Sequence, residues 1–108
     1  MIEQAPKEEI LDIINAIESN PNATQRVLSE RIGISLGKTN YLLKALIKKG
    51  VVKAKSFSRN PKKLRTIHYI LTNDGLRTKM HLLSHFLKIK EREYYQLKEE
   101  WGKLSGRR

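Results

Sequence analysis

The chain has 108 residues, 39% of them apolar, with 22 Lys or Arg against 11 Asp or Glu and no cysteine. This length suits one small domain, and the lack of cysteine excludes disulfides and thiolate chemistry. No stretch approaches the roughly 18 apolar residues of a membrane span, and the N-terminus lacks a signal-peptide core, so we expect a cytoplasmic protein without a membrane partner.

The charge is distributed unevenly. Residues 36–72 carry ten basic and no acidic side chains, whereas residues 1–35 carry three basic and six acidic ones. A segment that is only basic repels itself unless it meets a polyanion. Nucleic acid is the first candidate partner. An anionic membrane surface, an acidic protein and a basic face kept only for solubility are the alternatives.

The first third of the chain predicts two helices. Residues 6–9 combine a proline with an acidic pair, which favours a helix start, and residues 20–22 favour its end. Thr24 is a suitable N-cap for a second, short helix that Gly33 would end. The apolar spacing predicts that the two helices bury Ile10, Leu11, Ile13, Ile14, Ile17, Val27, Leu28 and Ile32.

Ser35 is the expected N-cap of a third helix that runs to about Lys49, before Gly50. Two helices joined by a short turn that contains glycine are typical of a helix-turn-helix. The inward stripe is expected at Thr39, Leu42, Leu43 and Leu46. The outward face is then Leu36, Gly37, Lys38, Asn40, Tyr41, Lys44 and Lys48.

The run GISLGKT at residues 33–39 has a second interpretation, as a phosphate-binding loop. Such a loop needs four residues between its first glycine and the Gly-Lys pair, and it must follow a buried strand. Only three residues intervene here, and a helix precedes the run. We therefore expect no enzyme, and a small nucleotide hydrolase is kept only as a further alternative.

The outward face has the chemistry of a DNA-reading helix, because its N-terminal half is the part that enters a major groove. Lys38 and Lys44 can meet phosphates or guanine, and Asn40 can pair with adenine. Tyr41 can reach a phosphate or a thymine methyl group, although it could simply cover the helix surface.

A basic β-hairpin is predicted next, with strands at residues 51–58 and 66–71 and a turn at residues 59–63. A basic hairpin directly after a helix-turn-helix is a wing, which would contact the minor groove or the phosphate backbone. A solvated loop is the alternative. His68, in the returning strand, is expected to be structural.

The last element predicted is a helix from the Thr72 cap to about Leu104. Apolar residues spaced alternately by four and three predict a coiled-coil seam with one polar break, and hence a homodimer. The seam residues are Leu76, Met80, Leu83, Leu87, Lys90, Tyr94, Leu97, Trp101 and Leu104. A second stripe, Leu82, Phe86 and Ile89, would pack on the chain's own domain. A helix that folds back on its own domain is the alternative.

His81 and His85 lie one helical turn apart and could hold a metal, but no third ligand is placed near them, so we expect no metal and no cofactor. The predicted fold class is mainly α with a small β-hairpin. The expected units are a winged helix-turn-helix over residues 1–72 and a dimerisation helix over residues 73–108.

TQRVLSERIGISLGKTNYLLKALIKKG and LTNDG resemble the MarR-type winged-helix regulators, and most of all their short subgroup associated with exopolysaccharide gene clusters. The resemblance covers about residues 7–104. It implies DNA contacts at Ser35, Leu36, Gly37, Lys38, Asn40, Tyr41 and Lys44, phosphate contacts near Thr24, Gln25 and Arg26, and wing contacts at Arg59, Lys62, Lys63 and Arg65. Compared with full-length MarR proteins, the chain lacks the extra helices around the dimer core, which leaves a small-molecule effector open.

These observations predict a homodimeric, sequence-specific DNA-binding transcriptional regulator. The third helix would enter the major groove of double-stranded DNA. The resemblance alone implies that the controlled genes concern exopolysaccharide production. The alternative is an architectural protein that binds DNA without sequence preference.

Overall fold

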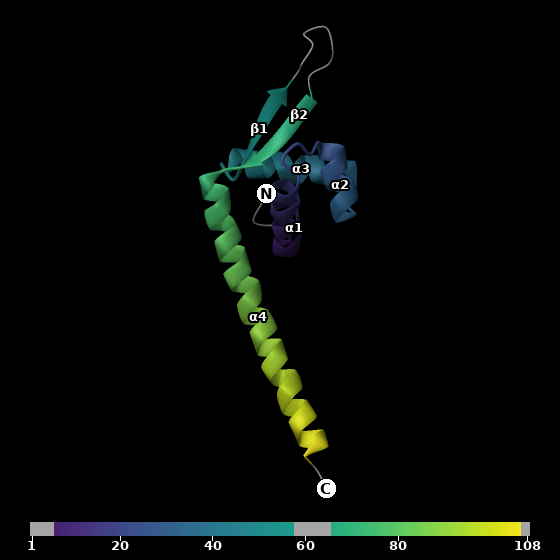
Figure 1. Cartoon of the computed structure of the whole chain (residues 1–108), viewed down its shortest axis with the longest axis vertical. Helices are drawn as coiled ribbons and strands as arrows, with labels where there is room; N and C mark the ends of the chain where they lie inside the picture. Colours follow the sequence, from purple (N-terminus) through teal and green to yellow (C-terminus); the bar gives the residue numbers. More distant parts are fainter. Residues whose placement is uncertain (1–5, 58–65, 107–108) are drawn as a thin grey trace.

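The computed structural model describes residues 6–57 and 66–106 (Figure 1). These residues form, in chain order, α1 (Lys7–Ser19), α2 (Gln25–Ile32), α3 (Leu36–Lys48), β1 (Val52–Phe57), β2 (Thr66–Leu71) and α4 (Asn73–Ser105). Figure 1 shows α1, α2, α3 and the hairpin gathered at one end, with α4 extending away from them as a rod. The molecule measures 76 × 24 × 22 Å. The predicted class, mainly α with a small hairpin, is confirmed.

The core is formed by α1, α2 and α3 together with the base of the hairpin and Leu82 of α4. The predicted inward stripe of α3 is confirmed, because Thr39, Leu42, Leu43 and Leu46 are at most 1% exposed. Ile13, Ile14 and Ile17 of α1 are buried with them, whereas Leu11 lies at the edge of the core and is partly buried. Burial of this many branched side chains stabilises a domain of this size, since each contributes roughly 1.5–3 kcal/mol of transfer free energy.

The short helix α2 begins and ends where the sequence predicts. The Thr24 hydroxyl accepts a hydrogen bond from the N–H of Val27 at 3.3 Å, and Gly33 ends the helix with a left-handed φ of 77°. The prediction that Val27 is buried was wrong, because its side chain is 38% exposed. Ser29 takes the buried position beside Leu28, and its hydroxyl donates to the carbonyl oxygen of Arg26 at 3.0 Å. This local bond lets a polar side chain replace an apolar one at the core.

Strands β1 and β2 pair in antiparallel register, with Val52 opposite Leu71 and Phe57 opposite Thr66. The first strand is shorter than predicted at its N-terminal end, where Val51 precedes the ladder. Tyr69 of β2 is buried in the core, and this burial raises the pKa of its phenol. The predicted turn over residues 59–63 lies outside the described residues.

The beginning of α4 is held against the segment that joins α3 to β1. The Thr72 hydroxyl accepts from the N–H of Gly75 at 2.9 Å, and the N–H of Thr72 donates to the carbonyl oxygen of Val51 at 3.1 Å. A Cβ at position 75 would overlap that carbonyl oxygen and the Leu71 side chain, so only glycine fits here. This is a physical reason for the glycine of the LTNDG run.

Beyond its first turn, α4 contacts α1. Lys79 forms an ion pair with Glu18, and Leu82 is buried at 8% exposure. Phe86 and Ile89, the other residues of the predicted second stripe, are half-buried. From residue 90 to the end of the described chain, every side chain of α4 is exposed. The rod in Figure 1 is therefore supported by the domain over its first half only.

Candidate nucleic-acid interface

The turn between α2 and α3 consists of residues 33–35. The N–H groups of Gly33 and Ile34 both donate to the carbonyl oxygen of Ser29, at 2.9 and 3.2 Å. The Ser35 hydroxyl then accepts from the N–H of Lys38 at 3.0 Å and caps α3. The run that resembled a phosphate loop is thus the end of one helix, a turn and the start of the next. This is the helix-turn-helix arrangement.

The outward face of α3 lies where the sequence predicts. Leu36, Gly37, Lys38, Tyr41, Lys44 and Lys48 are exposed, and so is the Ser35 cap, whereas Asn40 is half-buried. No acidic side chain lies on α3 or on its cap. A Cβ at Gly37 would meet no atom within 4 Å of the described structure, so the glycine relieves no contact inside the chain. It leaves room for another molecule to approach the backbone.

Lys38 forms an ion pair with Glu9, a contact that the sequence did not predict. Its Nζ lies 2.8 Å from Oε2 of Glu9, in the first turn of α1. The Glu9 side chain is 20% exposed and that of Lys38 is 47% exposed. The second carboxylate oxygen, Oε1 of Glu9, is buried without a hydrogen-bond partner among the described residues. A phosphate that binds Lys38 must therefore compete with the Glu9 carboxylate near the N-terminus of α3.

A second polar link joins α2 to α3. Nε2 of Gln25 donates to the carbonyl oxygen of Leu36 at 3.3 Å, and Nδ2 of Asn40 donates to Oε1 of Gln25 at 2.9 Å. Gln25 therefore places both ends of its amide against α3. Its neighbours at the start of α2 differ, since Thr24 is used as the helix cap and Arg26 is exposed.

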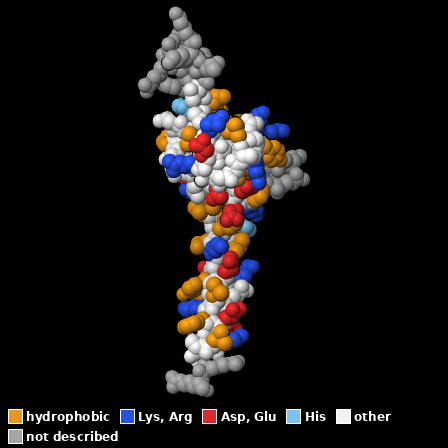
Figure 2. Space-filling view, turned by 90° about the vertical axis from the view of Figure 1, so that its right-hand side faces the viewer, with side chains coloured by type: hydrophobic (Ala, Val, Ile, Leu, Met, Phe, Trp, Pro, Cys, Tyr) orange, Lys and Arg blue, Asp and Glu red, His pale blue; other side chains and the backbone are white. Residues whose placement is uncertain are grey.

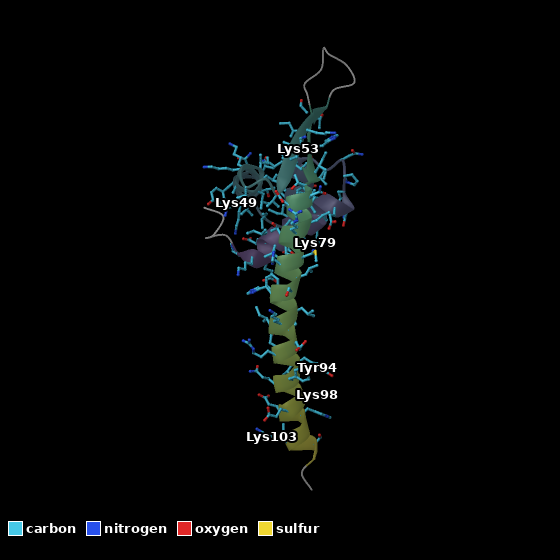
Figure 3. The ribbon with its side chains drawn as sticks, turned by 90° about the vertical axis from the view of Figure 1, so that its left-hand side faces the viewer. Lys49, Lys53, Lys79, Tyr94, Lys98 and Lys103 are labelled. Carbon is cyan, nitrogen blue, oxygen red and sulfur yellow. The ribbon has the colours of Figure 1, made fainter. Side chains whose placement is uncertain are left out.

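The hairpin adds cations that sequence reasoning did not select. Lys53 and Lys55 alternate along β1, and both are exposed. Figure 3 shows Lys53 on the hairpin and Lys49 at the end of α3, both at the winged end of the molecule. Alternation along the strand was the signal that could have identified the pair. The predicted wing contacts, Arg59, Lys62, Lys63 and Arg65, lie outside the described residues.

The seam of α4 lies on the surface of this single chain. Its described apolar members are between 46% and 72% exposed: Leu76, Met80, Leu83, Leu87, Tyr94, Leu97, Trp101 and Leu104. Lys90, the polar break, forms an ion pair with Glu93 at 3.6 Å. Figure 2 shows hydrophobic side chains projecting along the rod among charged ones. This exposure fits a surface that another chain covers.

The two histidines of α4 were the candidates for a metal site. Within residues 6–57 and 66–106, no group of three His, Cys, Asp or Glu side chains is arranged to hold a metal. His81 is exposed, and the half-buried His85 contacts Phe86 edge to face at 5.0 Å between ring centroids. Among the described helices, none is both long and apolar enough to cross a bilayer.

Comparison with known proteins gives a consistent picture. Residues 10–53 match the family described as winged helix-turn-helix DNA-binding. No curated protein matches the chain at a significant level. Among solved structures, Sso10a-2, a DNA-binding protein from Sulfolobus solfataricus, is similar over 94% of this chain and 96% of its own, with 26% identity and a TM-score of 0.66.

Two regulators from Staphylococcus aureus share the fold at lower identity. MarR, solved with salicylate and kanamycin, is 19% identical with a TM-score of 0.61, and the match covers 82% of this chain and 57% of that one. MepR in complex with DNA is 16% identical with a TM-score of 0.61, and the match covers 91% and 75%. Residues 10–53 therefore match the winged helix-turn-helix family, and with the hairpin and α4 the chain has a fold that recurs in DNA-binding proteins and in MarR-type regulators.

Proposed function

We propose that the chain is a homodimeric, sequence-specific transcriptional regulator. The outward face of α3 enters the major groove of double-stranded DNA, and the basic hairpin contacts the adjacent backbone or minor groove. Residues 1–72 serve as the DNA-binding unit and residues 73–108 as the dimerisation helix. A regulator of this type works in the cytoplasm on chromosomal DNA.

The observation that carries this proposal is the division of α3 into two faces. One face is buried in the core of the chain, while the other is exposed, carries cations and has no acidic residue of its own. The helix also begins at a capped end directly after the turn, and its first residues, Leu36, Gly37 and Lys38, are exposed. This is the part of a helix-turn-helix that reads base edges.

The homodimer rests on the seam of α4. With 33 residues the helix is about 50 Å long, and from Lys90 onward each described side chain of the helix is exposed. An isolated helix that exposes Tyr94, Leu97 and Trp101 would be marginal in water. A second copy supplies a matching stripe with the same alternation of four and three residues. Two copies of α3 would then read a site with two-fold symmetry.

The resemblance of the Ser35–Lys38 stretch to the short MarR-type subgroup extends the proposal to genes for exopolysaccharide production. The regulated genes can be found by sequencing chromosomal DNA that is cross-linked to the protein in cells. Binding sites that cluster elsewhere in the genome would remove this part of the proposal and leave the DNA-binding part intact.

The main experiment selects bound fragments from random double-stranded DNA at physiological salt. We expect a consensus with two-fold symmetry and a preference over random DNA of about 10³ or more. A preference near unity would overturn sequence-specific regulation. An asymmetric single site bound by one chain would overturn the homodimer.

A second candidate is an architectural protein that binds DNA without sequence preference. It is favoured by the likeness to Sso10a-2, which extends over nearly all of both chains. Sso10a-2 is described simply as a DNA-binding protein. The same selection separates the two functions, because an architectural protein would enrich no sequence while still showing a steep dependence of affinity on salt.

A further inference from the structure

Gln25 connects the backbone of α3 to a side chain on its outward face. Its Nε2 donates to the Leu36 carbonyl oxygen at 3.3 Å, and its Oε1 accepts from Nδ2 of Asn40 at 2.9 Å. Leu36 and Asn40 lie one helical turn apart, and Gln25 comes from α2 across the helix-turn-helix. These two bonds form a chain with a defined direction from donor to acceptor.

The direction of this chain is set by the Leu36 carbonyl, which can only accept a hydrogen bond. Gln25 must therefore turn its NH₂ group toward Leu36 and its oxygen toward Asn40. Asn40 must in turn present its NH₂ group to Gln25. Rotating either amide by 180° would bring two oxygens, or two NH₂ groups, into opposition and would lose a bond.

This orientation decides what Asn40 offers to a ligand. One hydrogen of its Nδ2 is used by Gln25, which leaves Oδ1 as an acceptor and the second hydrogen as a donor. No described residue donates to Oδ1. In the major groove, adenine presents a donor at N6 and an acceptor at N7, whereas guanine presents two acceptors at O6 and N7. The oriented amide can therefore accept from N6 of adenine and donate to N7. At guanine, its Oδ1 would face the O6 oxygen, which is also an acceptor.

We propose that Gln25 is a positioning residue that fixes the orientation of the Asn40 amide, so that Asn40 selects adenine over guanine at one position of each half-site. The inference rests on the proposed function, since it needs α3 in the major groove. It differs from a phosphate contact at Gln25, because both ends of the Gln25 amide are used inside the protein. Pre-orientation also lowers the entropy lost when Asn40 binds a base.

The experiment measures competition between adenine and guanine at each position of the selected half-site, for the wild-type full chain and for variants. In Asn40→Ala the preference at one position should disappear. In Gln25→Ala the Asn40 amide can rotate, so the adenine preference at that same position should fall by about tenfold, while the salt dependence of binding stays unchanged. Gln96→Ala, which removes an exposed amide from α4, is the matched control and should change neither quantity.

A second variant keeps the test independent of any loss of folding. Gln25→Glu retains an oxygen that can accept from Asn40, but its other oxygen opposes the Leu36 carbonyl and that bond is lost. The adenine preference should therefore lie between those of the wild type and Gln25→Ala, even though the added negative charge weakens binding to all sequences alike. Circular dichroism of each variant checks that the helices remain.

The outcomes separate the two levels of the argument. A wild-type protein without any base preference would overturn both the proposed function and this inference. A wild-type preference that survives unchanged in Gln25→Ala would overturn this inference alone. It would also be overturned if Gln25→Ala weakened binding to all sequences equally and reduced the salt dependence, since Gln25 would then be a phosphate contact.

Discussion

Helix α3 and the second half of α4 carry apolar stripes of similar spacing but meet very different surroundings. Leu42, Leu43 and Leu46 of α3 are at most 1% exposed, whereas Leu97, Trp101 and Leu104 of α4 are between 66% and 72% exposed. The first stripe is buried in the core of its own chain. The second has no such cover among the described residues. The comparison teaches that helical periodicity identifies a face that needs a partner but does not say which chain supplies it.

The largest effect is expected when the exposed apolar stripe of α4 is made polar. In Leu97→Glu/Trp101→Glu, charges in the proposed seam should prevent dimerisation and yield monomers in sedimentation equilibrium. DNA affinity should fall by about 10²-fold, because two linked half-site contacts become one. Glu99→Gln/Lys103→Gln removes two exposed charges from the same part of α4 and is the control. A double variant that remains dimeric would contradict the seam.

A second test compares the loss of stability when one leucine of each stripe is replaced by alanine. Leu43→Ala should lower the free energy of unfolding by about 2–5 kcal/mol, because it leaves a cavity in a closed core. Leu97→Ala should lower the melting temperature by an amount that depends on protein concentration, because its contacts lie in the proposed dimer. Thermal unfolding followed by circular dichroism at two concentrations separates the cases. If the melting temperature of both variants were independent of protein concentration, α4 would pack within its own chain.

The basic hairpin offers a smaller test, directed at the DNA-binding end. In Lys53→Ala, affinity should weaken by a few-fold for every DNA sequence, and the slope of log affinity against log salt should fall by about 1. Lys103→Ala, at the far end of α4, is the matched control (Figure 3). Fluorescence anisotropy over a salt series measures both quantities. An unchanged slope for Lys53→Ala would remove β1 from the interface.

The smallest expected effect concerns the ion pair between Glu9 and Lys38, near the N-terminus of α3. Glu9→Gln should strengthen binding to all DNA sequences by a few-fold at low salt, because it releases Lys38 and removes a negative charge near the phosphates. The gain should shrink as salt screens these interactions. Glu8→Gln changes the net charge equally on an exposed neighbour and serves as control. A gain of equal size in both variants would mean that only net charge matters.

Much of the fold follows from local signals. Thr24, Ser35 and Thr72 each accept the expected capping bond, and Gly33 ends α2 with a positive φ. Val27 was assigned to the wrong side because α2 has only eight residues. Two turns of helix hold too few apolar positions to define a face, and a serine that bonds its own helix can occupy the core.

The candidate site was predicted less completely. The outward face of α3 was identified from the rotation of 100° per residue, and Lys53 and Lys55 were within reach of the same reasoning on a strand. The links between Lys38 and Glu9 and between Asn40 and Gln25 were not. They join residues 29 and 15 positions apart, whose meeting depends on how α1 and α2 cross α3.

By itself, the sequence determined the helices, their caps, the turn of the helix-turn-helix and the faces that need covering, because each depends on residues within a few positions of one another. Only the tertiary structure decided which apolar face is covered inside the chain, why position 75 must be glycine, and which partners hold the polar side chains of α3. These depend on distances between segments far apart in the sequence, and no local pattern encodes such distances.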